Sequence, residues 1–238
     1  MHLNLSPQAL ALLPMWFVAF LMSLTCHEAA HALVAKWGGD LTAFHGGQVT
    51  LNPIPHMRRE PVGTIVVPLA FYFFSGWMMG WASAPYDPNW QRRHPRRAAW
   101  MALAGPAANM ILVLIAAACI HIGILVGIFH MPSSANFTHI VGAAPGDVAA
   151  GLATFLSIMF SLNLLLAVFN LIPIPPLDGN TAVGIFLPED VALKFVKKTR
   201  NPAFMILGLL LAWRAFDYIF NPLFTIGLNM LYPGAHFH

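Results

Sequence analysis

Five long apolar blocks constrain this chain more than any other feature of its sequence. Of the 238 residues, 58% are hydrophobic and only 9% are charged, whereas soluble domains usually carry about a quarter charged residues. A membrane-spanning helix needs about 20 consecutive apolar residues, so the sequence predicts an all-α polytopic membrane protein with about four to six transmembrane or re-entrant helices. The blocks cover residues 10–37, 62–82, 98–128, 147–171 and 203–220.

The segment after the first block differs in character. It is rich in Gly and Pro and alternates apolar and polar residues at 48–51, which predicts a short β-hairpin after the first helix. We find no internal repeat and no room for an added soluble domain. We therefore expect one membrane domain over residues 1–238, with a core at about 10–190 and a C-terminal helix at 203–220.

The basic residues indicate an orientation. The net charge of +3 does not indicate nucleic-acid binding, because the Lys and Arg stand between apolar blocks, where they orient a chain toward the cytoplasm. If block 62–82 dips into the membrane and returns, with the N-terminus outside, eleven of the twelve basic residues lie inside and only Arg214 lies in the membrane. If the block crosses, Lys36, Arg58 and Arg59 lie outside. The first arrangement is preferred, although 21 residues are also enough to cross.

The strongest chemical signal lies inside the first apolar block. His27-Glu28-Ala29-Ala30-His31 matches the pattern H-E-x-x-H, in which two histidines one helical turn apart bind one zinc ion. Glu28 is placed to take a proton from a water that the metal activates. Three such side chains in an apolar helix would cost several kcal/mol without a metal or partner. Polar contacts between helices are the plainer alternative.

A catalytic zinc usually has a third protein ligand, and acidic residues are scarce here. Asp178 is favoured because it follows the prolines of Asn170-Leu-Ile-Pro-Ile-Pro-Pro-Leu-Asp178-Gly179, a break that membrane proteins tolerate only around a protein-lined site. By residue count, His27 and Asn170 lie at a similar depth, toward the cytoplasmic side. The alternative role for Asp178 is capping the helix that follows it.

Together these two motifs resemble those of the site-2 protease family of intramembrane zinc metalloproteases. Further likeness to its compact prokaryotic branch lies in TLNP at 50–53, GWASAPYDP within 76–88 and AGPAAN at 104–109. Met57-Arg58-Arg59 departs from the branch pattern, where an acidic residue is commoner. The resemblance covers roughly residues 20–190.

The resemblance implies an intramembrane endopeptidase in a prokaryotic cell membrane, with its active site toward the cytoplasm, acting on a transmembrane protein substrate. One Zn²⁺ per chain would be bound by His27, His31 and Asp178. Glu28 would act as general base and acid, and Asn170 would hydrogen-bond the oxyanion. A strand edge near Gly46–Leu51 would hold the substrate extended.

Other functions remain open at this point. The chain could be a catalytically silent relative that binds client helices, although all five motif residues are intact. A zinc transporter would need polar groups along a path rather than at one depth. A prenyl-protein-processing protease typically uses a late helical Glu as third ligand, and Glu189 follows Pro188 outside the apolar block.

Several residues have no decided role. Gly105, Ala108 and Asn109 suggest close helix packing, and His56 could be a gate, a substrate contact or neither. Arg214 and Asp217 are spaced to pair with each other. We interpret the two cysteines, Cys26 and Cys119, as small buried residues. We interpret His236 and His238 as part of a tail. The sequence predicts neither the substrate nor the oligomeric state.

Overall fold

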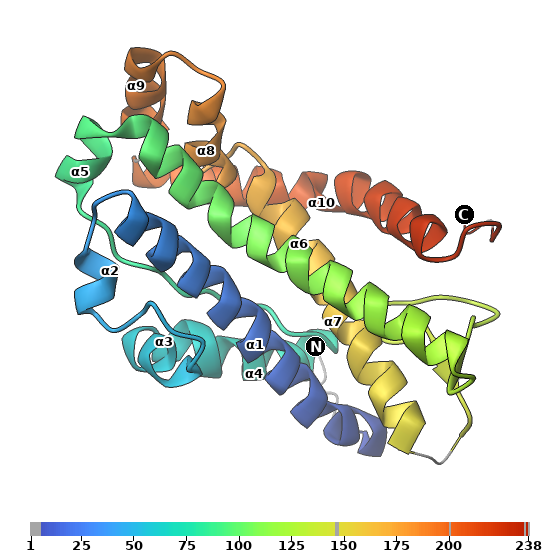
Figure 1. The fold of residues 1–238 in the computed structure, drawn as a ribbon. Helices are drawn as coiled ribbons and strands as arrows, with labels where there is room; N and C mark the ends of the chain where they lie inside the picture. The colour runs from blue at the N-terminus through green and yellow to red at the C-terminus, as the bar shows by residue number, and fades with distance from the viewer. Residues whose placement is uncertain (1–5, 146–147, 200, 236, 238) are drawn as a thin grey trace.

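Three long helices lie side by side at the centre of the protein (Figure 1). The computed structural model describes residues 6–145, 148–199, 201–235 and 237. The central helices are α1 (Pro7–Trp37), α6 (Pro95–Leu125) and α7 (Val148–Leu171), each long and apolar enough to cross a membrane. A fourth span is α10 (Pro202–Leu231), if its two parts, bent by 47°, count as one. The predicted all-α polytopic membrane fold is confirmed, and α10 extends beyond the predicted 203–220.

The helix ends follow from local sequence. Ser6 accepts a hydrogen bond from the Ala9 amide at the start of α1, and Asn201 accepts one from Ala203 at the start of α10. Each capping residue is followed by a proline, whose missing N–H costs nothing in the first turn. α1 ends at Gly38, whose amide donates to the carbonyl of Val34.

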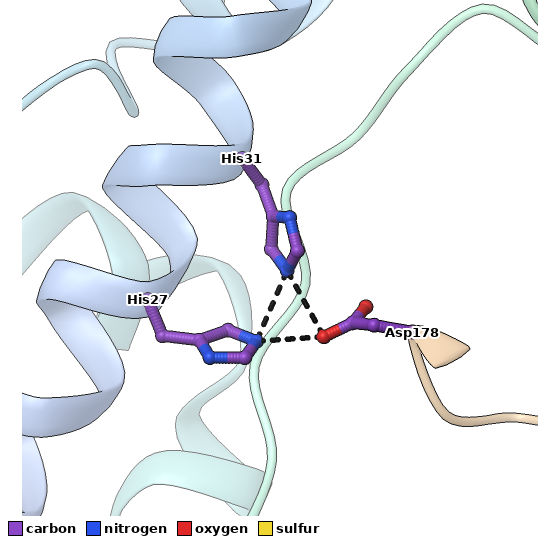
Figure 2. Close-up of side chains that lie close together, drawn as sticks. All are labelled: His27, His31 and Asp178. Carbon is purple, nitrogen blue, oxygen red and sulfur yellow. Dashed lines mark hydrogen bonds and ion pairs between the residues drawn. The ribbon is translucent and has the colours of Figure 1, made fainter. Parts of the chain in front are cut away.

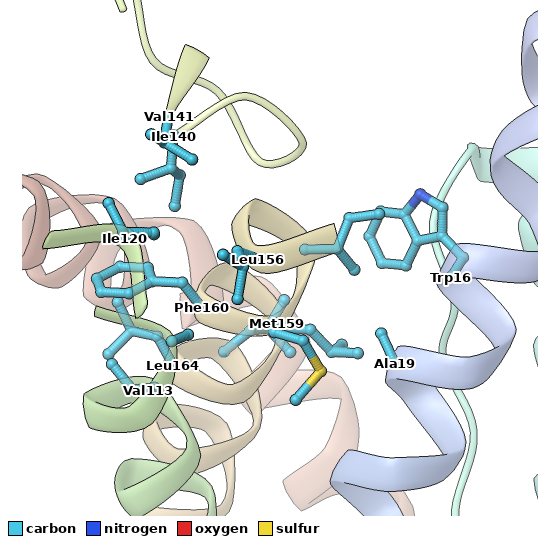
Figure 3. Packing of buried hydrophobic residues seen from close by; sticks show 14 of the residues in the cluster. Trp16, Ala19, Val113, Ile120, Ile140, Val141, Leu156, Met159, Phe160 and Leu164 are labelled. Atoms are coloured by element: carbon cyan, nitrogen blue, oxygen red, sulfur yellow. The ribbon is translucent and has the colours of Figure 1, made fainter. Parts of the chain in front are cut away.

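Helix α7 is the most enclosed of the three central helices. In the most apolar 18 residues of each helix, 67% are buried for α7, against 39% for α1 and 28% for α6. Trp16 and Ala19 of α1 and Ile120 of α6 pack into the same hydrophobic cluster as Phe160 of α7 (Figure 3). We conclude that α7 is the element against which the others are positioned.

Short elements gather at the two ends of the long helices. At one end lie α2 (Thr42–His45), α3 (Pro53–Arg59), α5 (Pro88–Arg93), α8 (Gly179–Ala182), the 3-10 turn η2 (Val183–Ile185) and α9 (Glu189–Thr199) (Figure 1). Two basic residues tie this end together: Arg97 donates to the Gly38 carbonyl at 3.1 Å, and Arg96 lies 3.6 Å from Glu189. At the other end, β1 (Phe129–His130) and β2 (Gly142–Ala143) form an antiparallel pair.

The strand pair therefore lies between α6 and α7, and the predicted hairpin after the first helix was wrong in position. Residues 46–52, which are all described, contain no strand. Gly46 and Gly47 end α2 in a turn, and the Asn52 side chain caps α3 by accepting from Ile54. The Gly-Gly and Asn-Pro pairs that suggested a hairpin thus end and begin two short helices.

The first part of block 62–82 is helical, and the chain then runs back beside it in an extended conformation. The π-helical turn η1 (Val62–Val66) leads into α4 (Val67–Ser75), which ends at Gly76 with φ of 79°. The Trp81 amide then donates to the Gly63 carbonyl at 3.0 Å, and Ser83 donates to Glu60 at 2.8 Å. Since the two ends of the block lie together and its helix is shorter than a span of about 20 residues, the geometry favours the re-entrant path.

This return depends on the absence of a side chain at Gly63. A Cβ there would overlap the Trp81 carbonyl oxygen and lie 2.8 Å from its indole ring. We expect Gly63→Ala to lower the free energy of unfolding in detergent by about 1–3 kcal/mol, as overpacking does. Gly151→Ala is the matched control, because its methyl would lie 3.5 Å from the flexible end of Met15. Equal stability of the two variants in thermal unfolding would contradict the described path.

Candidate metal centre

His27 and His31 stand on successive turns of α1, and their side chains converge on one point (Figure 2). Their Nε2 atoms lie 3.0 Å apart. Asp178 meets them from the start of α8, with Oδ2 at 3.0 Å from His27 Nε2 and 3.3 Å from His31 Nε2. The structure thus brings together the three residues predicted as metal ligands.

The approach of Asp178 follows from the break after α7. Pro173, Pro175 and Pro176 cannot continue the helix, and the chain makes tight turns through Ile174 and Leu177 before α8 begins. Asp178 occupies the N-cap position of α8, yet its side chain makes no capping hydrogen bond. The capping alternative is therefore not what the carboxylate does.

Hydrogen bonds on the far side of each imidazole determine how the rings face the centre. His27 Nδ1 lies 2.6 Å from Asn109 Oδ1, and His31 Nδ1 lies 2.7 Å from the Met101 carbonyl oxygen. Both partners are acceptors, so each Nδ1 carries a hydrogen and donates it. In the neutral rings the lone pairs are then on the two Nε2 atoms, the arrangement found in metal-binding histidines.

Two nitrogen lone pairs and a carboxylate oxygen at these distances repel one another unless a proton or a metal ion lies among them. The separations of 3.0–3.3 Å are close to the edge of about 3.3 Å expected for a tetrahedron with bonds of about 2.0–2.1 Å to zinc. Two His and one Asp, with the fourth position open, match the ligand set of catalytic zinc sites. The residues present therefore fit a zinc ion.

The centre is enclosed by protein, and the Asp178 side chain is only 23% exposed. The two histidines are 5% and 7% exposed. An ionised carboxylate held in so enclosed a position is suited to be a metal ligand.

Helix α6 packs against this centre at a glycine. A Cβ on Gly105 would overlap Nε2 of both His27 and His31. The small residues at 105–109, which suggested close helix packing, therefore also leave space for the imidazole rings.

The other predicted residues are placed less directly. Glu28 is 5% exposed and close enough to His31 to interact with it electrostatically. Asn170, on the last turn of α7, donates to the Leu166 carbonyl at 3.0 Å. His56 is buried and contacts the Thr50 carbonyl through Nε2 at 3.1 Å. The roles of these residues remain predictions.

Sequence reasoning missed the polar residues behind His27. Asn109 was interpreted as a packing residue and Asn163 was not singled out, yet both are fully buried and belong to one hydrogen-bonded chain that reaches His27. The available signal was an Asn near the middle of two apolar blocks, Asn109 in 98–128 and Asn163 in 147–171, since Asn is a costly residue in a membrane helix.

An apolar groove of about 470 Å³ lies between α1, residues 49–51 and α6, and none of the three ligand candidates lines it. It is lined by α1 at Ala29 and Ala30, which stand between the two histidines in sequence, by residues 49–51, and by α6 at Ala108 and Ile111.

Comparison with known proteins agrees with this geometry. The sequence model of Peptidase family M50 matches residues 15–213. The chain belongs to peptidase family M50. This is the site-2 protease family, so the predicted resemblance is confirmed, and the protein is a membrane metalloprotease by family.

Two relatives of this M50 peptidase are named as candidate zinc metalloproteases. YwhC of Bacillus subtilis is 32% identical over 223 residues, covering 93% of this chain and 91% of its own length. Rip2 of Mycolicibacterium smegmatis is 28% identical over 195 residues, covering 81% of this chain and 64% of its own length. No solved structure matches the chain.

The overlap at Gly105 yields a test of the centre. Gly105→Ala should push the two imidazoles apart and lower the zinc content of this M50 peptidase well below one ion per chain, while the helix content measured by circular dichroism stays the same. In the control, Gly184→Ala, the new methyl would lie 3.4 Å from the methyl groups of Ala99 and Ala192, an ordinary contact. A Gly105→Ala protein with the zinc content of the control would refute the described packing.

Proposed function

We propose that this protein is an intramembrane zinc endopeptidase that hydrolyses a peptide bond in or near a transmembrane segment of another membrane protein. In this proposal His27, His31 and Asp178 bind one zinc ion per chain, and Glu28 and Asn170 are catalytic. The observation that supports it most is that three candidate ligand atoms lie within 3.3 Å of one another. The elements that bear them are almost 150 residues apart in the sequence. Such a meeting inside an apolar helix bundle is costly unless it serves a metal.

The chain's own residues supply acid–base and positioning roles. A zinc ion bound here would polarise the scissile carbonyl and lower the pKa of a water toward 7. Glu28, next to His27 on the buried side of α1, would accept a proton from that water and pass it to the leaving amine. Asn170 would donate its amide N–H to the developing oxyanion, which requires its side chain to leave the Leu166 carbonyl.

The groove suits the substrate that this chemistry needs. A helical substrate hides its peptide bonds in its own hydrogen bonds, so it must become extended before hydrolysis. Residues 49–51 line the groove, and Leu51 is 71% exposed. We propose that an unwound substrate segment lies in the groove, against residues 49–51.

The orientation rests on charge. The end of the protein near the ligand-bearing break carries Arg96, Arg97 and the basic residues of α9. The positive-inside rule places this end in the cytoplasm. We propose that the whole chain forms one domain in a prokaryotic cell membrane, with the zinc site toward its cytoplasmic side.

A silent relative that binds client helices is the second candidate. It would keep the groove, but selection for client binding alone would not require Glu28 to remain beside a complete ligand set. The two functions separate in the following test, because a silent relative binds a substrate helix without cutting it.

The test combines zinc content with cleavage of a model transmembrane substrate, both on the full chain in detergent. The wild type should hold about one zinc per chain, which His27→Ala and Asp178→Ala should lose. Glu28→Gln should keep its zinc and lose cleavage by at least about 100-fold, the lower range for a general base. His121→Ala removes an exposed histidine from α6 and should change neither quantity.

Each outcome has a definite meaning. Undiminished zinc in Asp178→Ala would remove the third ligand from the proposal. A wild type that holds stoichiometric zinc and binds the substrate helix without cutting it would favour the silent relative. Cleavage retained in Glu28→Gln would refute the assigned general base.

A further inference from the structure

A chain of buried polar side chains connects all three central helices to His27. Asn163 of α7 donates through Nδ2 to Ser23 Oγ at 2.9 Å and to the Met159 carbonyl at 2.8 Å. Asn109 of α6 donates through Nδ2 to Asn163 Oδ1 at 2.8 Å and to the Ser23 carbonyl at 3.3 Å. Ser23, Asn109 and Asn163 are each 0% exposed, so water cannot replace any of these partners.

Backbone carbonyls decide which way both amides face. A carbonyl oxygen only accepts, so the Met159 carbonyl requires the NH₂ group of Asn163 on its side and leaves Oδ1 facing Asn109. Asn109 then faces two acceptors, Asn163 Oδ1 and the Ser23 carbonyl, and must turn its own NH₂ toward them. Its remaining atom, Oδ1, is left to face His27 Nδ1.

We infer that Asn163, acting through Asn109, is a positioning residue that selects the zinc-binding tautomer of His27. Because Asn109 Oδ1 faces His27 Nδ1, that nitrogen must carry the hydrogen of the neutral ring. Nε2 then carries no hydrogen and presents its lone pair toward Asp178. The inference rests on the proposed zinc site. It goes beyond that site because Asn163 touches neither a ligand atom nor the groove in any described contact.

The two histidines are held differently, which is why Asn163 matters for only one of them. His31 Nδ1 faces the backbone carbonyl of Met101, an acceptor that cannot turn into a donor. His27 Nδ1 faces a side-chain amide, which presents either an oxygen or an NH₂ group depending on its rotation. The contacts to Asn163 Oδ1 at 2.8 Å and to the Ser23 carbonyl at 3.3 Å restrict that rotation, and the Asn163 contact is the shorter.

The plainer reading is that these Asn residues only bind the helices together, since side chains of this kind often hydrogen-bond between membrane helices. The readings differ in what Asn163→Leu should do. Leucine fills a similar volume but offers no acceptor, so the NH₂ group of Asn109 keeps only its longer 3.3 Å contact to the Ser23 carbonyl. Asn109 can then turn that NH₂ group toward His27 Nδ1 more readily. His27 would then carry its hydrogen on Nε2 and could not bind zinc through that atom.

The experiment measures zinc affinity by competition with a chelator, on the full chain in detergent, well below the unfolding temperature. Asn163→Leu should weaken zinc binding by about 10–100-fold, the usual effect of losing a hydrogen-bond partner behind a ligand. Asn163→Asp, protonated because it is buried, keeps an oxygen toward Asn109 and an O–H toward Met159, and should retain clearly more affinity than Asn163→Leu.

Ser157→Ala is the matched control on the same helix. Ser157 Oγ accepts from Ile140 and donates to the Ala153 carbonyl, so its loss should lower thermal stability without changing zinc affinity. The pair Asn109→Leu and Asn163→Leu should also be non-additive: the double variant should bind zinc no more weakly than Asn109→Leu alone, because both act through one hydrogen bond.

Wild-type zinc affinity in Asn163→Leu, or a loss no greater than that in Ser157→Ala at equal loss of stability, would overturn the inference. A fully additive double variant would also overturn it. The proposed function fails separately, if the wild type binds no zinc or if His27→Ala leaves its affinity unchanged.

Discussion

The rest of the structure depends on the meeting of two imidazole nitrogens and one carboxylate oxygen inside an apolar bundle. At separations of 3.0–3.3 Å these atoms repel one another unless a proton or a metal ion lies among them. Helix α1 is regular so that His27 and His31 stand one turn apart, whereas the chain after α7 is broken so that Asp178 can turn inward. Regular and irregular backbone are thus both required at this centre.

Helix α6 supports the centre by close approach and by hydrogen bonding. Its glycine at position 105 leaves space for both rings, and its Met101 carbonyl and Asn109 side chain hold the far side of each ring. Block 62–82 contributes differently: Tyr72 donates to the Ala9 carbonyl, which ties that block to the start of α1. Membership in peptidase family M50 is consistent with a site built in this way.

Sequence patterns predicted the long helices and the three ligand candidates, because apolar block length and H-E-x-x-H spacing are direct consequences of helix geometry. They failed for residues 46–51, where Gly-Gly and Asn-Pro pairs fit a hairpin and a pair of short helices equally well. They also missed Asn163, whose importance lies only in the neighbours that it acquires across three helices. Which end of an amide faces a histidine is decided by tertiary contacts, and no local pattern contains that information.

The most direct test of this account is X-ray absorption at the zinc edge of the purified full chain. We expect a first shell of nitrogen and oxygen atoms only, at about 2.0–2.1 Å, with the outer-shell signature of two imidazoles. His27→Ala should lose the zinc or reduce that signature to one imidazole. A sulfur atom at about 2.3 Å, or a wild-type zinc without two imidazoles, would contradict the assignment of His27, His31 and Asp178 as its ligands.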